Sequence, residues 1–421
     1  MMTQSNSSEP RDITVIGAGI VGMSCALFLQ RDGHRVTVID PVDPGSDAQT
    51  SFGNAGSISM SSVLPTALPG IWRKLPRMLA DPTGPLAIRW RYLATLAPFL
   101  LSFLRNTAGG RVEANGRAIA ALINGVFDAY DTLVAETRTQ DLIIRRGSLK
   151  VYRTGQSFAA AAFERKLLTE NGFEFEILNS DELRQLEPAL APIFEHAMYM
   201  PQSGGSTNPG QLVRRFAESF VAKGGTFHRA RATGFQFADG SVCGVTAGSR
   251  NIAADAVVLA AGSWSRSLAR QLGAPVMLEA ERGYHVMLAK PPVTLQRFTM
   301  FADAQFALGV HDDGLRVTTG VEYASVDAPP NYRRIRALLP QVALSVRDLD
   351  ITERSIWMGR RPTLPNSVPM IGRSPRHANA FFAFGHSHLG LTMGPVTGRI
   401  IADLMANRDP GIDMTPYRVN R

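Results

Sequence analysis

A glycine-rich motif near the start of the chain has the residue types and spacing of a phosphate-binding turn. It spans residues 17–22 and reads Gly-Ala-Gly-Ile-Val-Gly, a match to the pattern G-x-G-x-x-G. The first glycine permits a tight turn, the second lets the backbone approach a pyrophosphate, and the third lets a helix pack on a strand. An acidic residue about 20 positions further on can accept hydrogen bonds from ribose hydroxyls. The pattern predicts an adenine dinucleotide, either FAD or NAD, bound by Gly17, Gly19, Ile20, Val21, Gly22 and Asp40.

The segments around this motif predict the strand, helix and strand that such a site needs. Residues 12–16 are compact and β-branched, as in a strand that is buried on both faces. Apolar periodicity over 23–29 predicts a helix, and the apolar run 35–39 predicts the strand that ends at the acid. A helix that begins near Ile20 would offer unpaired N–H groups and its positive dipole end to the phosphates. The glycine motif alone is weak evidence, but between this strand and this helix it specifically indicates a dinucleotide-binding site.

The composition is that of a folded protein with a sizeable core. Of the 421 residues, 45% are hydrophobic and 19% are charged, which excludes a disordered chain. The net charge of +8 favours an anionic partner, but the basic residues are dispersed, so we expect no nucleic acid. Two cysteines without close Cys/His spacing predict no metal site and a reducing, cytoplasmic setting. The apolar run 13–29 contains three glycines and lacks a preceding basic cluster, so we expect no export signal.

The layout of the remaining chain favours FAD over NAD. A doubly wound NAD dehydrogenase would continue with alternating strands and helices directly after the acid. Instead, a stretch rich in Gly, Ser, Asn and Pro runs from Thr50 to Pro85. Strand patterns typical of a nucleotide-binding fold return at 255–262 and 381–385. A nucleotide domain divided by long insertions is typical of large FAD-dependent oxidoreductases.

Five motifs together resemble the D-amino acid oxidase superfamily, and most closely the bacterial D-amino acid dehydrogenases (small subunit). They are the segment from Gly17 to Asp40, Ser51–Gly56, the strand that ends at Gly262, Gly359–Pro362 and Gly385–Thr392. The resemblance implies an α/β fold, α+β overall, with a Rossmann-like FAD-binding domain assembled from discontinuous segments. A substrate domain with an antiparallel sheet and helices is expected beside it. The expected boundaries are 12–62, 203–272 and 362–405 for FAD binding, 63–144 for a helical insertion, and 145–202 and 273–361 for the substrate domain.

The resemblance also implies which residues surround the flavin. The loop after the acid is expected beneath the ring, where small residues let backbone amides come close. The segment after Gly385 is expected to direct N–H groups at the flavin N1–C2=O edge, where a helix N-terminus stabilises the negative charge of the reduced ring. A plain helix start capped by Thr392 is the alternative. The cofactor-binding residues expected are Ser51, Gly53, Asn54, Ala55, Gly56, Ala232, Ala261, Gly262, Gly359, Gly385, Gly390, Leu391 and Thr392. Some relatives attach flavin through a cysteine, but Trp357, Met358 and Gly359 stand at that place, so we expect noncovalent FAD.

Arg361 is the expected substrate anchor. By resemblance, the arginine of an Arg-Pro pair holds the substrate carboxylate, and a guanidinium matches a carboxylate bidentately. Arg360 is either a salt-bridge partner or a second anion contact. In the strand 281–288, period two places Tyr284 and His285 on opposite faces, so only one can face the flavin, and the family resemblance favours Tyr284. His386 completes the candidate catalytic set, although a lone histidine is more often structural.

The reaction implied by the resemblance is oxidative deamination of a D-amino acid. Hydride transfer from the substrate Cα to flavin N5 would give an imino acid that hydrolyses to a 2-oxo acid and ammonia, with electrons passed to a quinone or another acceptor. No nucleophile or metal is needed, because the cofactor supplies the chemistry. The alternatives are oxidation of a secondary amine (sarcosine, D-proline, hydroxyproline or an iminodicarboxylate), of a 2-hydroxy acid, and a flavin-containing RNA-associated protein.

An apolar segment at 86–104 has two interpretations. Tyr92–Leu104 carries no charge but is too short to span a bilayer. Cationic and tryptophan side chains surround it, as in helices that lie in a membrane interface. It is either such a contact, on the cytoplasmic face of the inner membrane, or a helix pair that covers the substrate pocket. The flanking residues are Trp72, Arg73, Lys74, Arg77, Arg89, Trp90, Arg91 and Arg105.

Overall fold

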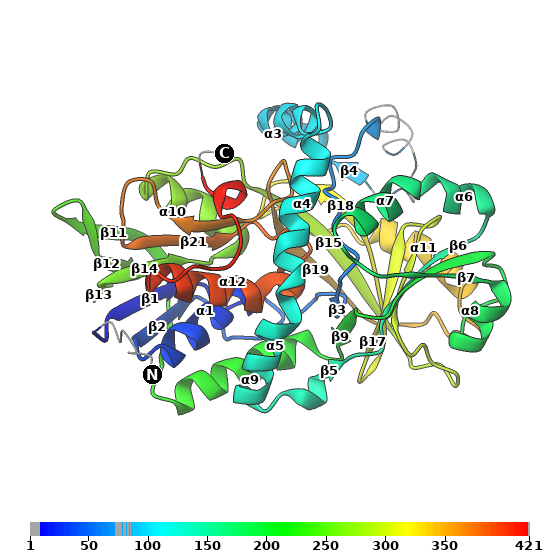
Figure 1. Ribbon diagram of the computed structural model, residues 1–421, viewed down its shortest axis with the longest axis horizontal. Coiled ribbons are helices and arrows are strands. Elements are labelled where there is room, and N and C mark those ends of the chain that lie inside the picture. Colours follow the sequence, from blue (N-terminus) through cyan, green and yellow to red (C-terminus); the bar gives the residue numbers. More distant parts are fainter. Residues whose placement is uncertain (1–8, 72–77, 79–80, 82–83, 85, 420–421) are drawn as a thin grey trace, which may run out of the picture.

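A six-stranded sheet carries the glycine motif. The computed structural model describes residues 9–71, 78, 81, 84 and 86–419 (Figure 1). In spatial order the strands are β10 (Thr226–Arg229), β2 (Arg35–Asp40), β1 (Asp12–Ile16), β14 (Ala256–Leu259), β21 (Ala380–Phe384) and β20 (Met370–Arg373). Neighbouring strands run parallel from β10 to β21, and β20 is antiparallel at the edge.

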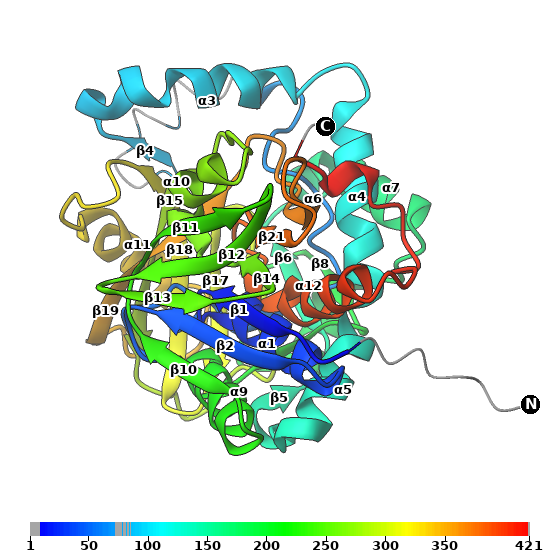
Figure 2. The ribbon, with the colours of Figure 1, turned by 90° about the vertical axis from the view of Figure 1, so that its left-hand side faces the viewer.

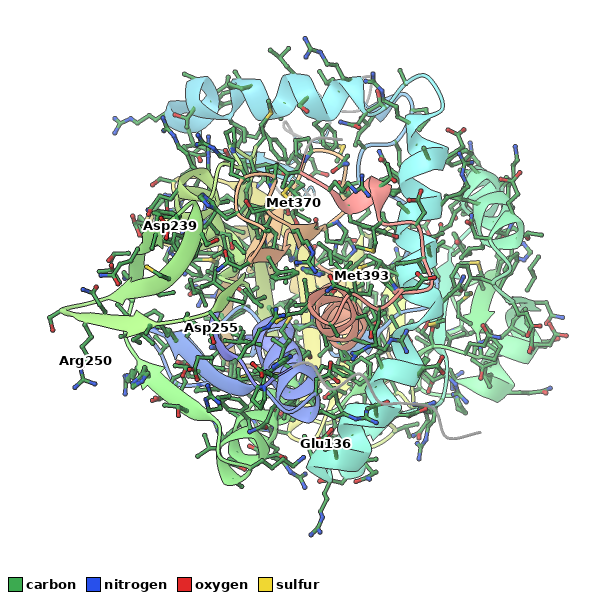
Figure 3. The ribbon with its side chains drawn as sticks, turned by 60° about the vertical axis from the view of Figure 1, so that its left-hand side comes forward. Glu136, Asp239, Arg250, Asp255, Met370 and Met393 are labelled. Carbon is green, nitrogen blue, oxygen red and sulfur yellow. The ribbon has the colours of Figure 1, made fainter. Side chains whose placement is uncertain are left out.

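Two helices bring their amino ends to one edge of this sheet. Helix α1 (Ile20–Arg31) follows β1 and α12 (Gly390–Met405) follows β21. Because β1 and β21 are parallel to the same intervening strand, both helices begin at the carboxyl edge of the sheet. They can pack closely because residue 398 is a glycine. A Cβ atom there would lie only 2.6 Å from the Ser24 backbone. Met393 of α12 lies in the interior (Figure 3), and α9 (Pro209–Ala222) packs on α1.

A nine-stranded sheet, largely antiparallel, forms the second large layer. Its strands are β19 (Glu353–Thr363), β15 (Glu279–Leu288), β18 (Gly314–Tyr323), β17 (Phe306–His311), β16 (Phe298–Phe301), β6 (Ser148–Tyr152), β8 (His196–Met200) and β7 (Glu176–Asn179), with β4 (Leu86–Ile88) beside β18. Helix α11 (Arg333–Ala343) packs its buried apolar residues against one face of this sheet. The opposite face contacts the loop that follows β2.

Smaller elements complete the layers. A meander of β11 (Ala232–Ala238), β12 (Ser241–Ala247) and β13 (Arg250–Ala253) extends outward from the nucleotide sheet, at the left of Figure 1. A short sheet joins β3 (Ser57–Ile58), β9 (Gly204–Ser206) and β5 (Ile143–Ile144). The remaining α-helices are α3 (Leu93–Arg105), α4 (Arg111–Asn124), α5 (Val126–Thr137), α6 (Gly155–Ala160), α7 (Ala162–Glu170), α8 (Ser180–Leu186) and α10 (Ser265–Gln271); short 3-10 turns span Trp90–Tyr92, Gln140–Leu142, Gly262–Trp264 and Thr415–Tyr417.

The insertion after residue 62 lies against both layers. Helices α4 and α5 pack on α12, whereas α3 lies across the outside of the molecule (Figure 2). Among the described residues, one helical stretch, 111–137, is long and apolar enough to cross a membrane, and 56% of its most apolar window is buried, as in a core helix. Trp72, Arg73, Lys74 and Arg77 lie outside the described residues.

The fold class expected from the sequence is confirmed. The six-stranded sheet takes strands from 12–62, 203–272 and 362–405, while the segments 145–202 and 273–361 supply most of the nine-stranded sheet. The insertion also contributes a strand, β4, which pairs with Val321–Tyr323. The exact division into domains stays a prediction.

Candidate active site

A cavity of about 1960 Å³ lies between the two large sheets. Pockets for small ligands typically measure about 300–1,000 Å³, so this one can hold a dinucleotide together with a small substrate. Its wall includes the glycine motif, the loop at 51–57, the end of β14, the start of α12, and strands β15, β18 and β19. All expected cofactor residues border it except Gly22, Gly56 and Gly385.

Gly17 and Gly22 act through close backbone packing. Gly17 has φ +111°, and a Cβ atom there would lie 2.3 Å from the carbonyl oxygen of Ala260. A Cβ atom at Gly22 would lie 1.8 Å from the carbonyl oxygen of Gly17. Larger residues at either position would therefore push α1 away from the strands. The tight turn and the close helix–strand contact predicted for these glycines are both present.

Asp40 lies beside the amino end of α1. Its carboxylate accepts hydrogen bonds from the N–H groups of Ala18 (2.8 Å) and Val42 (3.0 Å). Burial raises the pKa of Asp40, while these two hydrogen bonds oppose the rise. The Ser51 hydroxyl accepts a hydrogen bond from Ile20 N–H at 3.0 Å, so loop and helix meet where phosphates are expected.

The amino end of α12 is open toward the cavity. The N–H groups of Gly390, Leu391 and Thr392 have no acceptor within the helix, because they belong to its first turn. The Thr392 hydroxyl does not cap the helix; it donates to Ser57 O (3.3 Å) and accepts from Ser59 N–H (3.2 Å). Donors are thus left for a ligand, as an anionic flavin edge requires. The alternative of a Thr392 cap is wrong.

Three glycines shape the cavity through their lack of a side chain. A Cβ atom at Gly53 would lie 1.9 Å from the Trp357 ring, and one at Gly359 would lie 2.2 Å from the same ring. Gly385 has φ +90°, and its Cβ position is blocked by Leu364 at 2.5 Å. Gly385 therefore shapes the turn into α12 and does not itself line the cavity.

Arg361 borders the cavity, but it is already paired with a carboxylate. Its Nη1 donates to Glu281 at 2.9 Å and to Gly320 O at 3.3 Å, and Glu281 also accepts from the Thr363 hydroxyl. The pair follows from sheet register, since Glu281 on β15 lies opposite Arg361 on β19. Within the described part of the chain, Nε and Nη2 of Arg361 make no hydrogen bond. Two N–H-bearing nitrogens thus stay free for a substrate carboxylate.

Tyr284 borders the cavity, but its hydroxyl is engaged away from it, and its expected role at the flavin stays a prediction. Its hydroxyl donates to Glu322 and accepts from Asn331 N–H. Its ring belongs to the apolar cluster under α11, although the residue also borders the cavity. His285, on the opposite side of the strand, faces the loop, with Nδ1 3.2 Å from Gly53 O. His285 thus contacts the loop but, unlike Tyr284, does not line the cavity.

His386 is bound inside the fold. Its Nε2 lies 2.9 Å from the Thr397 hydroxyl, and burial lowers its pKa to about 3. The imidazole is therefore neutral near pH 7, and the residue borders the cavity. The catalytic role expected for His386 stays a prediction. Arg360 borders the cavity, donates to Val326 O, and lies 5.8 Å from the Trp264 ring, without a salt bridge among the described residues.

The site and the fold are those of a flavin-dependent oxidoreductase, and the comparisons with known proteins agree. A family model described as FAD dependent oxidoreductase (DAO) matches residues 12–404. The chain therefore belongs to the DAO family of FAD-dependent oxidoreductases, whose relatives here are amino-acid oxidases and dehydrogenases. A protein named D-amino-acid oxidase from Bradyrhizobium diazoefficiens is 36% identical over 418 residues, which are 98% of this chain and 99% of the relative.

Two solved structures show the same fold over almost the full length. A glycine oxidase from Geobacillus kaustophilus has a TM-score of 0.74 and 20% identity, with 98% of this chain and 99% of that chain covered. An L-proline dehydrogenase from P. horikoshii has a TM-score of 0.75 and 18% identity, with 98% of each chain covered. The family and the FAD cofactor expected from the sequence are confirmed.

The residues present fit FAD. The glycine motif and Asp40 suit the adenosine and pyrophosphate, and the open N–H groups of α12 suit an anionic ring edge. Neither cysteine lines the cavity: Cys25 is buried in α1 and Cys243 lies exposed on β12. This arrangement agrees with the expected noncovalent attachment.

Replacement of Gly19 by valine is expected to abolish FAD retention while leaving the chain folded. Gly19 has an ordinary extended backbone (φ −72°), and its Cβ position lies 3.2 Å from Ser51 Oγ, in the approach to the α1 amino end. The measurement is flavin absorbance per protein after gel filtration, with circular dichroism to report folding. Gly155→Val is the matched control, because its Cβ position has no neighbour closer than 3.7 Å. A yellow Gly19→Val protein would contradict the pyrophosphate assignment.

Proposed function

We propose that this protein oxidises a D-amino acid, held by its carboxylate at Arg361 in the cavity between the two sheets. The observation that carries the proposal is the partly free guanidinium of Arg361 on the cavity wall. The relative named D-amino-acid oxidase, 36% identical along the chain, supports the choice of substrate class.

Arg361 and its neighbours bind and orient the substrate. The Nε and Nη2 groups form a fork that matches a carboxylate, while Glu281 fixes the guanidinium through Nη1. Gly283 leaves room for this guanidinium, since a Cβ atom there would lie 2.3 Å from Nη2. Bound FAD would supply the acceptor for the hydride that leaves the substrate Cα, and water would hydrolyse the resulting imino acid to a 2-oxo acid and ammonia. The protein supplies orientation and a site enclosed by two sheets.

A secondary amine is the second candidate substrate. The solved structures with the same fold include a glycine oxidase and an L-proline dehydrogenase. Proline, named in the second of these, is a cyclic secondary amine. Such a substrate carries the same carboxylate and would use the same guanidinium. A 2-hydroxy acid shares the carboxylate as well.

An anaerobic screen distinguishes these classes. D-amino acids are expected to bleach the visible flavin band of the purified protein, and their L-enantiomers are not, because the carboxylate anchor fixes which Cα hydrogen faces the flavin. The panel contains D- and L-amino acids, N-methyl amino acids, proline and 2-hydroxy acids. Bleaching by the last three groups and not by D-amino acids would contradict the proposal.

Substitution of Arg361 by methionine is expected to raise KM for carboxylate substrates by roughly 10- to 100-fold, because it removes hydrogen bonds to a charged group. FAD content should stay unchanged. Since the change also leaves Glu281 unpaired, the double variant Arg361→Met/Glu281→Gln separates lost binding from charge repulsion. Arg336→Met, an exposed ion-pair partner of Glu353, is the control. Unchanged kinetics in both Arg361 variants would refute the anchor.

Electron transfer to a quinone at the cytoplasmic face of the inner membrane is the remaining part of the proposal. The outer side of α3 and the 3-10 turn before it support this part: Trp90 of the turn (72% exposed) and Leu101 of α3 (60% exposed) present apolar surface, while Leu96 and Phe99 are buried against Tyr323. Arg91 precedes this helix and Arg105 ends it, whereas Arg89 is paired with Glu322. Apolar side chains bordered by cations suit the interface of an anionic membrane.

Leu101→Glu is expected to weaken sedimentation with vesicles of anionic lipid, because it places a negative charge in the apolar outer face of α3. The matched control is Leu344→Glu, at an apolar residue of similar exposure (64%) that follows α11. The measurement is the protein fraction pelleted with the vesicles at low and moderate salt. If the parent protein does not sediment, or both variants sediment as it does, the membrane contact is wrong.

A further inference from the structure

A buried arginine of the substrate sheet holds the loop that borders the flavin site. Arg316 on β18 donates through Nη1 to the carbonyl oxygens of Phe52 (2.9 Å) and Asn54 (2.6 Å). These acceptors lie more than 250 positions away in the sequence. Its Nε contacts Met287 Sδ at 3.2 Å. One guanidinium nitrogen thus joins two points of the loop to the sheet.

Two histidines hold the intervening carbonyls of the same loop. His285 Nδ1 lies 3.2 Å from Gly53 O, and His311 Nε2 lies 3.3 Å from Ala55 O. The loop can approach this closely because β17 has glycine at position 309, where a Cβ atom would lie 2.0 Å from Ala55 O. Four consecutive carbonyls, from residue 52 to 55, therefore contact side chains of three neighbouring strands.

The charge of Arg316 has no carboxylate at salt-bridge distance among the described residues; Asp313 acts on it only through longer-range attraction. The Arg316 side chain itself is buried (6% exposed). Burial lowers its pKa to about 10, so it stays charged near neutral pH. Burial, followed by the repulsion of Arg316, lowers the pKa of His285 to about 3 and also lowers that of His311. The cluster therefore carries one positive charge.

Two amides of the loop are left open. The N–H groups of Gly53 and Ala55 donate to no group in the described part of the chain, and both residues line the cavity. The other amides of residues 52–56 bond within the segment 49–56. With every carbonyl from 52 to 55 held against the sheet, these two N–H groups are the donors that the loop can offer to a ligand.

We propose that Arg316 is a positioning residue for the flavin: it fixes the loop so that the amides of Gly53 and Ala55 serve the ring, and its unpaired charge stabilises the reduced state. The inference rests on the proposed function and on the flavin ring lying beside residues 51–56, as the family resemblance implies. Reduction adds negative charge to the ring, and a fixed cation in a site of low polarity stabilises that charge more than it would in water. Arg316 would thereby raise the midpoint potential.

The test uses the FAD-loaded protein without amino-acid substrate. Sulfite adds to flavin N5 through the sulfur lone pair, and the displaced electron pair leaves a negative charge on the ring. In Arg316→Met the dissociation constant of this adduct is expected to rise. The two-electron midpoint potential, measured with a reference dye, is expected to fall by about 30 mV. For a two-electron couple, this fall corresponds to a change of about tenfold in the equilibrium constant of reduction.

Two further variants separate charge from positioning. Arg354→Met removes an exposed cation of β19 that donates to Asp313 O, and it is expected to change neither quantity. Arg316→Lys keeps the charge but loses the rigid fork, so we expect a potential near that of the parent with weaker FAD binding.

Unchanged potential and sulfite affinity in Arg316→Met would refute the electrostatic role. If that variant does not fold, unchanged FAD affinity in Arg316→Lys would refute the positioning role. Neither readout uses an amino acid, so both stay interpretable if the substrate screen fails.

Discussion

The backbone donors that α1 and α12 leave unpaired are the constraint from which the rest of the site follows. Each buried N–H group without a partner costs about 1–3 kcal/mol, and both helices present such groups to one cavity. A fold that leaves these N–H groups unpaired regains stability when a bound anion accepts their hydrogen bonds. The parallel strands β1 and β21 place both helix ends at the same edge, so one elongated cofactor can meet both.

The parts of the site that are local in sequence could be predicted from it. The turn at Gly17–Gly22 and the start of α12 depend on neighbouring residues whose types reveal the backbone shape. The Arg361–Glu281 pair could not be predicted, because it depends on the register of β15 against β19. The role of Arg316 could not be predicted for a similar reason: the acceptors of its hydrogen bonds, Phe52 and Asn54, lie far away in the chain. No spacing rule connects a strand residue to carbonyls of a distant loop.

The choice between Tyr284 and His285 shows where a periodic pattern reaches its limit. Alternation correctly placed the two on opposite faces, but it does not say which face meets the other domain. The apolar row that contains Tyr284, Val286 and Leu288 was a usable signal, since such a row belongs to a core, here the one under α11. Both rows nevertheless contribute to the cavity wall, Tyr284 from the apolar row and Glu281 from the other, so alternation alone does not decide which row faces the flavin.

Arg361, which is half-buried, and Arg316, which is buried, differ in how their charge is treated. Arg361 is largely neutralised by Glu281, which suits a group that binds a carboxylate and must release a product. Arg316 has no such partner, although a buried cation is costly unless paired. That cost is tolerable where a negative charge develops nearby during the reaction, and the loop between Arg316 and the cavity is the segment expected under the flavin. The unpaired charge thus connects the stability of the loop with the chemistry beside it.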